Sequence, residues 1–183
     1  MIVGEYSRQS ITKVSIMENT TLSAAQQKFL RNLNTPWKMW FWFLLKLPSL
    51  TFWGVRIQRI TPQRGQTSIP AGWRTQNPFR STYFAAQCGA AELSTGTLGL
   101  LAIEGQSVLV SMLVTNLEAS FVKKATSRIT FTCEDGEAIA ATVKRAVDSG
   151  EGQQFVATST GTQENGEVVA VVKVTWSFKA KTR

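Results

Sequence analysis

Apolar positions near the start of the chain recur every three to four residues, which is the period of a helix. They predict a helix over residues 22–34, where Thr21 or Ser23 can cap the first-turn N–H groups. Pro36 suits the first turn of a second helix. That helix must end near Pro48, because proline has no N–H to donate.

A strand is expected after these helices, because Gly54, Arg56 and Gln58 then alternate with the apolar residues Trp53, Val55 and Ile57. Residues 52–60 alternate in this way and predict a first strand. Residues 61–69 are typical of a polar turn, and residues 71–76 predict a short strand. The Asn77-Pro78 dipeptide then ends this strand.

The stretch over residues 81–103 contains no proline and is long enough to predict a helix. It is rich in alanine and includes Gly89, Gly96 and Gly99. Each glycine costs about 1 kcal/mol relative to alanine in a helix. A helix accepts this cost where another element approaches its backbone closely, as a curled sheet would.

The rest of the chain is mostly strand. Strands are predicted over residues 107–117, 127–133, 153–160 and 168–179. In the last of them every second residue from Val168 is apolar, which is the pattern of a half-buried antiparallel strand. Asn165-Gly166 forms the turn before it. Residues 135–148 return to helical spacing and predict a short surface helix.

Strands that are clustered after a helix favour an α+β fold with an antiparallel sheet. The chain has 183 residues, of which 43% are hydrophobic, and this is enough for one core. We therefore expect a single domain over residues 21–183, after a lead-in over residues 1–20 that can be flexible. The lead-in lacks the continuous apolar core of a secretory signal.

Histidine is absent, which excludes Ser-His-Asp, Cys-His and histidine-metal mechanisms. Cys88 and Cys133 lie in apolar patterns without Cys or His neighbours at metal-binding spacing, so no metal site is expected. We interpret both cysteines as small buried hydrophobic residues. Reduced thiols favour a cytoplasmic location.

The net charge of +8 favours an anionic partner, which can be nucleic acid, an acidic membrane surface or a phosphorylated small molecule. Basic residues are scattered, and the adjacent pairs are Lys123–Lys124 and Lys144–Arg145. Because nucleic-acid tails carry longer basic runs, nucleic-acid binding is disfavoured.

Residues 37–53 are rich in aromatic side chains but also contain Lys38, Lys46 and Pro48. The segment is too short and interrupted to span a membrane. It is either an interfacial helix, a wall of a ligand channel, or a core helix packed on the sheet. We favour the core helix, because the interiors of globular proteins also need large apolar faces.

Glu92 is the only charged residue between Arg80 and Glu104, in the middle of the helix that is expected to be most buried. A buried charge costs several kcal/mol unless it is paired or hydrogen-bonded. Glu92 is therefore a general base or nucleophile in a dry pocket, a partner in a structural salt bridge, or a residue on a helix turn that faces solvent.

Other polar groups near this helix are weaker candidates. Asn77 precedes the helix and can hold a carbonyl group or a water, although Asn-Pro more often forms a turn. The helix start at Tyr83 and Phe84 offers free N–H groups to an oxyanion. Thr95 and Thr97 can orient the carboxylate of the acid, although helix hydroxyls more often bond the preceding turn.

The segment NPFRSTYFAAQCGAAELSTGTLG resembles the loop and central helix of hotdog acyl-CoA thioesterases. In that family an Asn or Gln precedes the helix and a catalytic Asp or Glu lies inside it, which Asn77 and Glu92 match. The resemblance assigns the helix-start amide to Phe84, and a hydroxyl one turn after the acid to Thr95 or Thr97. The chain departs from the pattern at Tyr83-Phe84-Ala85, where many thioesterases have His-Gly-Gly.

Over residues 22–180 the chain is similar to a thioesterase-like hotdog branch known as a domain of unknown function. The resemblance implies a central helix wrapped by a curved antiparallel sheet, with N-terminal helices added. It further implies a homodimer, which can pair into a tetramer, with Asn77 of one subunit facing Glu92 of the other. Lys123, Lys124 or Arg128 can then bind the phosphates of coenzyme A.

Two functions follow from this resemblance. The first is an acyl-CoA thioesterase that hydrolyses a fatty or aromatic acyl thioester, with coenzyme A as part of the substrate and no separate cofactor. The second is a protein of the same fold that binds an acyl chain or lipid without hydrolysis. Nucleic-acid binding through the net charge is a third hypothesis.

Overall fold

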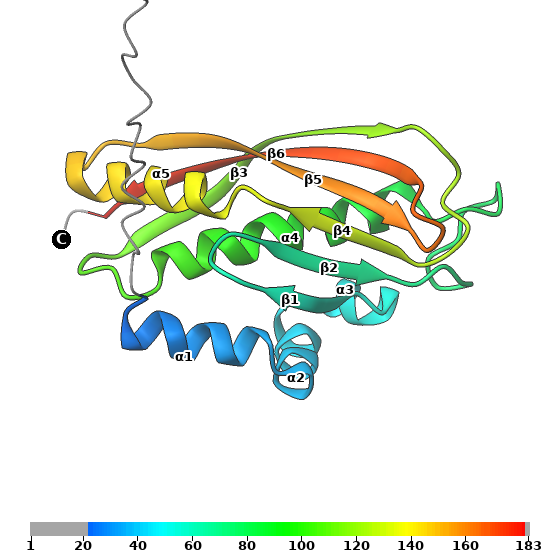
Figure 1. The fold of residues 1–183 in the computed structure, drawn as a ribbon, viewed down its shortest axis with the longest axis horizontal. Coiled ribbons are helices and arrows are strands. Elements are labelled where there is room, and N and C mark those ends of the chain that lie inside the picture. The colour runs from blue at the N-terminus through cyan, green and yellow to red at the C-terminus, as the bar shows by residue number, and fades with distance from the viewer. Residues whose placement is uncertain (1–21, 182–183) are drawn as a thin grey trace, which may run out of the picture.

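The computed structural model describes residues 22–181, so the lead-in over residues 1–20 lies outside the described residues (Figure 1). The helices are α1 (Ala24–Leu33), α2 (Pro36–Lys46), α3 (Pro48–Trp53), α4 (Phe84–Ile103) and α5 (Gly136–Ser149). The strands are β1 (Arg56–Ile60), β2 (Gly65–Ile69), β3 (Val110–Phe121), β4 (Ile129–Cys133), β5 (Gln153–Gln163) and β6 (Val168–Ala180).

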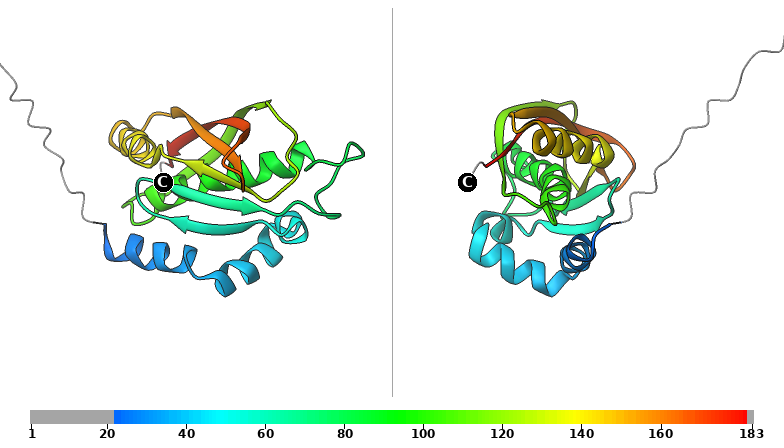
Figure 2. Two further views of the ribbon diagram at one scale, coloured as in Figure 1. Left: turned by 45° about the vertical axis from the view of Figure 1, so that its right-hand side comes forward. Right: turned by 90° about the vertical axis from the view of Figure 1, so that its left-hand side faces the viewer.

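One antiparallel sheet of six strands, in the order β1-β2-β4-β5-β6-β3, curves around the central helix α4 (Figure 2). Helix α5 packs beside α4 against β5 and β6, while α1, α2 and α3 lie along the β1 end of the sheet. This is the α+β arrangement predicted from the sequence, with the long small-residue helix enclosed by sheet.

The small residues of the sheet and of α4 permit the close approach that the sequence predicts. A Cβ atom on Gly65 of β2 would lie 2.1 Å from the backbone oxygen of Ser94 in α4. On the opposite side, a Cβ atom on Gly99 would lie 2.5 Å from the terminal methyl carbon of Met112 in β3. Glycine is therefore required at position 65, where the strand meets the backbone of the helix, whereas the flexible end of Met112 can move away from position 99.

The first helix begins as predicted, with Ser23 as its cap. Ser23 Oγ accepts from the backbone N–H of Gln26, and Gln26 Oε1 accepts from the N–H of Ser23. Pro48 does more than end the second helix, because it also begins α3. Gly54 closes α3 in the left-handed conformation at φ 72°. The predicted strand over residues 52–60 is therefore wrong in its first half.

Residues 65–69 are strand β2, so the polar turn predicted over residues 61–69 is wrong there. A polar strand can be buried at this position because Thr67 Oγ1 donates to the backbone oxygen of Ala90 at 2.7 Å. The strand predicted over residues 71–76 is also wrong. Thr75 Oγ1 accepts from the N–H of Gly72 and holds the segment in a turn.

The predictions for the second half of the chain are confirmed, with element ends shifted by a few residues. The inner face of β6 is buried, as its alternation predicts, although Val168 itself is exposed. Gly166, at φ 85°, forms the predicted turn before β6.

The favoured interpretation of residues 37–53 as a core helix is wrong for most of its side chains. Met39 and Phe43 are the buried residues of α2, whereas its other large apolar side chains are exposed. None of the described helices is both long and apolar enough to cross a bilayer.

Candidate functional site

Glu92 lies in the middle of α4, on a strip of the helix that the sheet covers incompletely. Ala85, Cys88 and Glu92 follow one another at helical spacing and are each half-buried, whereas most of α4 is buried. One turn before Glu92, a Cβ atom on Gly89 would lie 3.1 Å from the Trp53 ring of α3. The strip is therefore bounded on one side by α3.

The other neighbours of Glu92 are Gly96 and the Trp176 ring of β6. A Cβ atom on Gly96 would lie 3.2 Å from Glu92 Oε1 and 3.1 Å from Trp176 Cζ2. The carboxylate and the indole thus both lie over the bare helix surface at Gly96. The absence of a side chain there leaves room for the acid beside the sheet.

Within residues 22–181 the carboxylate of Glu92 forms no hydrogen bond and no salt bridge. Within the described residues, Glu92 therefore does not form the structural salt bridge that was one of the alternatives. Burial raises the pKa of the Glu92 carboxyl group above its usual range, because the ionised form loses water. A carboxylate of this kind is a stronger base than an exposed one, as general base catalysis near neutral pH requires.

Replacing Glu92 with glutamine is expected to stabilise the fold at high pH. The raised pKa means that the folded state holds its proton to a higher pH than the unfolded chain does. The free energy of unfolding therefore falls as pH rises from the pKa of Glu92 in the unfolded chain to its pKa in the folded protein. Above that range, the folded state bears the full cost of burying the ionised carboxylate. Thermal unfolding at pH 4 and pH 8 should show a higher Tm for Glu92→Gln than for the parent at pH 8, with little difference at pH 4.

Glu151→Gln is the matched control, since Glu151 is an exposed loop residue. Its Tm should follow that of the parent at both pH values. A large loss of Tm in Glu92→Gln at pH 8 would instead show that the carboxylate stabilises the fold.

Thr95 and Thr97 direct their hydroxyl groups to the helix backbone. Thr95 Oγ1 donates to the Glu92 backbone oxygen at 2.9 Å and accepts from Trp176 Nε1 at 2.9 Å. Thr97 Oγ1 donates to the Leu93 backbone oxygen at 2.9 Å. Both hydroxyls are buried, and Thr95 positions the Trp176 ring that lies beside the acid.

Asn77 organises the loop before α4. Its Oδ1 accepts from the backbone N–H groups of Phe79 at 3.0 Å and Ser81 at 3.2 Å, and its Nδ2 donates to Ser81 Oγ at 3.0 Å. These contacts are those of an Asn-Pro turn. One N–H of Nδ2 has no partner among the described residues, so it is available to a ligand.

The first turn of α4 carries exposed aromatic side chains. Tyr83 is the N-cap, and its ring packs edge-on against Phe84 at a centroid distance of 4.8 Å. Phe84 in turn packs against Phe121 of β3 at 6.3 Å. The N–H of Phe84 has no partner within the described residues. Because Phe84 precedes Glu92 by eight residues, the two lie about 12 Å apart along the helix.

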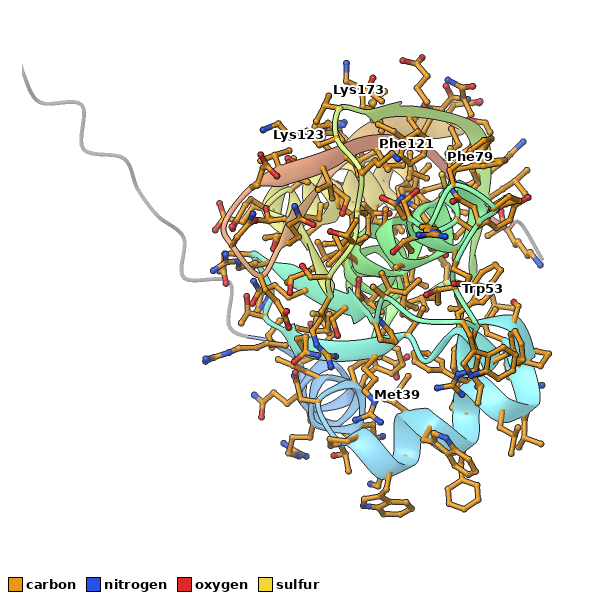
Figure 3. The ribbon with its side chains drawn as sticks, turned by 90° about the vertical axis from the view of Figure 1, so that its right-hand side faces the viewer. Met39, Trp53, Phe79, Phe121, Lys123 and Lys173 are labelled. Atoms are coloured by element: carbon orange, nitrogen blue, oxygen red, sulfur yellow. The ribbon has the colours of Figure 1, made fainter. Side chains whose placement is uncertain are left out.

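The basic residues expected to bind coenzyme A phosphates lie in the loop after β3, which packs against the start of α4 through the Thr82 N–H and the Ala125 oxygen. Lys123 is paired with Glu167, and Arg128 approaches Glu164 at 3.8 Å. Lys124 forms no salt bridge within residues 22–181. Figure 3 shows Lys123 and Phe121 on the opposite side of the molecule from Met39 of α2.

Both cysteine thiols are poor nucleophiles in this structure. Burial raises the pKa of Cys133 to about 12 and raises that of the half-buried Cys88. Across residues 22–181, no three His, Cys, Asp or Glu side chains are grouped to bind a metal. Glu92 is therefore the side chain on the open strip that can act as a base.

The structure adds Trp176 and Trp53 as neighbours of the strip that the sequence did not assign to the site. Trp176 could have been placed on the inner face of its strand from the alternation, but not next to Glu92. That contact depends on how β6 crosses α4, and no sequence pattern reports it.

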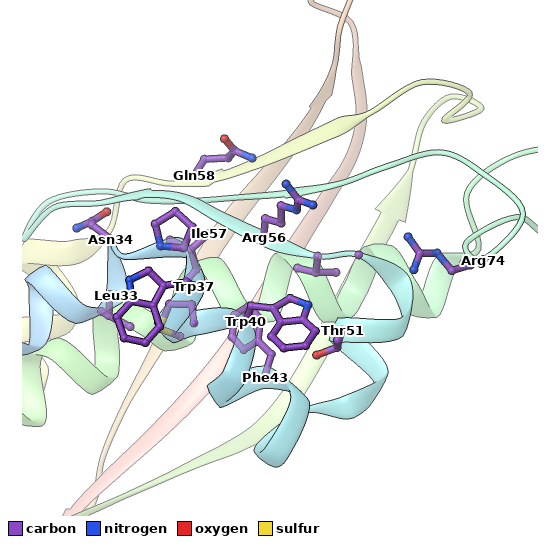
Figure 4. Close-up of a pocket in the computed structure, with 14 residues that line it drawn as sticks. Leu33, Asn34, Trp37, Trp40, Phe43, Thr51, Arg56, Ile57, Gln58 and Arg74 are labelled. Carbon is purple, nitrogen blue, oxygen red and sulfur yellow. The ribbon is translucent and has the colours of Figure 1, made fainter.

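A separate cavity of about 520 Å³ lies between α2 and β1 (Figure 4). Trp37, Trp40 and Phe43 form one wall, and Arg56 and Arg74 stand at the other. The aromatic segment therefore does line a cavity. None of the residues predicted for the site contributes to its lining.

A sequence model of the domain of unknown function DUF4442 matches residues 38–178. The chain belongs to the DUF4442 family. No curated protein matches it significantly. Membership confirms the predicted resemblance to a branch of unknown function.

Solved structures that resemble this DUF4442 protein include thioesterases. A Pseudomonas aeruginosa protein of unknown function, described as a probable thioesterase, has a TM-score of 0.67 at 20% identity over 85% of this chain and 95% of its own. A thioesterase from Haemophilus influenzae has a TM-score of 0.56 at 14% identity, over 82% and 90% of the two chains. The DUF4442 protein thus has a hotdog, thioesterase-like fold.

A thioesterase enzyme from Staphylococcus aureus, solved as a mutant in which a glutamine is replaced, has a TM-score of 0.53 at 14% identity. The match covers 71% of the DUF4442 chain and 97% of the other. The same S. aureus protein was also solved with a glutamate replaced by alanine.

Proposed function

We propose that this DUF4442 protein hydrolyses an acyl-CoA thioester, with Glu92 as the general base. The observation that carries the proposal is the unpaired, half-buried carboxylate of Glu92 on the open strip of the enclosed helix. The thioesterase-like fold supports an acyl thioester as the substrate class. The glutamine and glutamate replaced in the S. aureus mutants are 15 positions apart, as are Asn77 and Glu92.

In the proposed reaction, Glu92 takes a proton from water, and the resulting hydroxide adds to the thioester carbonyl carbon. The carbonyl oxygen gains negative charge, which the free N–H of Phe84 and the spare N–H of Asn77 stabilise. The carbon–sulfur bond then breaks, and the coenzyme A thiolate leaves and takes up the proton that Glu92 took from water. The products are a carboxylic acid and free coenzyme A.

This chemistry requires two subunits. Phe84 and Glu92 are about 12 Å apart along one helix, so they cannot both reach one carbonyl group. In a two-fold dimer the central helices can run antiparallel, which brings the start of one helix to the middle of the other. Asn77 and Phe84 of one subunit then act together with Glu92 of its partner.

The β3 edge of the sheet supports a homodimer. β3 is an outer strand of the sheet, and its exposed side chains include Leu113, Leu117 and Phe121. An open edge with apolar side chains is a surface on which a second copy can continue the sheet. Pairing of such dimers into a tetramer and a cytoplasmic location stay predictions.

A mixture of two inactive variants is expected to recover activity if the site is shared between subunits. Heterodimers of Asn77→Ala and Glu92→Gln chains contain one site in which both residues are intact. After denaturation and refolding of an equimolar mixture, about a quarter of the parent activity should return, because half of the dimers are mixed and half of their sites are intact.

Each variant refolded alone serves as the control and should stay inactive. A mixture that stays inactive, while its dimers are shown by mass to have exchanged subunits, would contradict a shared site.

The proposed activity is tested by incubating the purified protein with acyl-CoAs of graded chain length and with an aromatic acyl-CoA. Free coenzyme A is measured with a thiol reagent. Release above the spontaneous rate for at least one acyl group is expected. The absence of release across the whole series would reject the enzymatic function.

A non-catalytic acyl-binding protein is the second candidate function. The observation that favours it is the start of α4, where Tyr83 and Phe84 stand in place of the His and Gly of many thioesterases and Asn77 is engaged in its own loop. Native mass spectrometry would then detect an intact acyl ligand on the protein, and added acyl-CoA would bind without being consumed.

A further inference from the structure

Helix α2 leaves a set of large apolar side chains exposed. The exposed positions recur at i, i+3, i+4, i+7 and i+8, which is the pattern of one face of an amphipathic helix. We call this set the aromatic face; its residues are Trp37, Trp40, Phe41, Leu44 and Leu45. α2 lies at the outside of the molecule beyond β1 (Figure 1), and all five side chains are exposed, although Trp37 and Trp40 also border the cavity between α2 and β1.

Further large apolar side chains outside α2 are also exposed. Phe52 of α3 and Trp73 of the loop between β2 and α4 are exposed and pack edge-on at a centroid distance of 6.0 Å. Isolated exposed apolar residues are normal, but a contiguous set this large indicates an interaction surface. Met39 and Phe43 on the opposite side of α2 hold the helix on the protein.

The stretch of chain that carries α2 and α3 has charged residues of one sign only. From residue 22 to residue 91 the chain has nine Lys and Arg residues and no Asp or Glu, while the remainder has slightly more acidic than basic residues. Of these nine cations, Arg64 forms a salt bridge with Glu134, and no other forms one within residues 22–181. The net charge of the protein is thus concentrated in the part of the chain that carries α2.

These observations favour an anionic bilayer surface as the occupant. A second copy of the chain would bring two strongly basic surfaces together, which costs energy. Helices that lie in the membrane interface are rich in Trp, Phe and Leu and also contain Lys. The aromatic rings lie at the level of the headgroups, and the charged amines point toward water and phosphate. With 11 residues, α2 is about 16 Å long, so it can lie on a bilayer but cannot cross it.

We propose that the aromatic face of α2 docks this protein onto membrane surfaces that contain anionic phospholipids. The aromatic rings and leucines enter the boundary between headgroups and acyl chains. Lys38 and Lys46, at the two ends of α2, contact the headgroup phosphates. This inference is independent of the proposed hydrolysis, because it concerns where the protein binds and not what Glu92 does.

The test uses the full chain and vesicles of phosphatidylcholine with and without phosphatidylglycerol. Protein should sediment with the anionic vesicles, and added salt should release it. Tryptophan emission should shift to the blue on binding, since three of the six tryptophans lie on α2. Leu45→Glu should weaken binding about tenfold or more, and Lys38→Gln about fivefold.

Leu109→Glu is the matched control, because Leu109 is 76% exposed and Leu45 is 77% exposed. It lies next to β3, away from α2, and should bind vesicles as the parent does. Equal binding of Leu45→Glu and the parent, or no binding to anionic vesicles, would overturn the proposal. A smaller particle mass for Leu45→Glu without lipid would overturn it too, and would show that the face joins protein subunits.

Discussion

Replacing Glu92 with glutamine is expected to lower kcat for acyl-CoA hydrolysis about a hundred- to ten-thousandfold. Glutamine has nearly the same size and cannot accept a proton from water at neutral pH. The other contacts of the strip do not depend on the charge, since the Glu92 carboxylate has no partner within residues 22–181. KM should therefore change much less than kcat, as steady-state rates of coenzyme A release will show.

The fold of the variant is checked by its Tm, which should equal or exceed that of the parent at neutral pH. Glu151→Gln, in an exposed loop, should hydrolyse the substrate at the parent rate. A Glu92→Gln protein that is folded and retains full kcat would show that another group acts as the base.

Replacing Gly65 with alanine is expected to destabilise the protein by about 3 kcal/mol, which lowers the Tm by roughly 10 °C. The added methyl group would lie 2.1 Å from the backbone oxygen of Ser94, and a backbone atom cannot move aside as a flexible side chain does. Strand β2 would have to move away from α4, which would break the hydrogen bond from Thr67 to the backbone oxygen of Ala90. Denaturant unfolding measures the loss.

Gly152→Ala is the control for glycine itself, because no atom lies within 4 Å of a Cβ at that position. Its free energy of unfolding should stay close to that of the parent. If Gly65→Ala proved as stable as Gly152→Ala, the close packing of β2 on the central helix would be contradicted.

The central helix could be predicted from the sequence because its signal is local. A long run of small and apolar residues without proline has few alternatives to a buried helix, and Glu92 stands out as its only charge. The last strand could also be predicted, since the alternation along one strand directly indicates which face is buried. These two elements identify the fold class and the candidate acid.

The first sheet strands could not be predicted because their burial depends on distant partners. The residues of β2 are mostly polar, and they become a buried strand because Thr67 bonds to Ala90 in α4. Pro48 indicates the end of a helix, but a proline serves equally well as the start of the next helix. Local patterns are ambiguous in both cases.

The surroundings of Glu92 could not be predicted from the sequence either. Trp176 follows Glu92 by more than 80 residues, and their shared contact with Gly96 arises from the path of β6 over α4. The core-helix interpretation of residues 37–53 is wrong for a related reason. The composition of an apolar helix does not indicate which of its sides packs against the protein. The exposure of Leu45 is visible in the structure alone.

The most direct test is a crystal structure of the protein with an acyl-CoA analogue in which a thioether replaces the thioester and cannot be hydrolysed. We expect the sulfur to lie on the open strip of α4, within reach of the Glu92 carboxylate of one subunit and of the Phe84 N–H of the other. An analogue bound in the cavity between α2 and β1, with the strip of Glu92 empty, would contradict it.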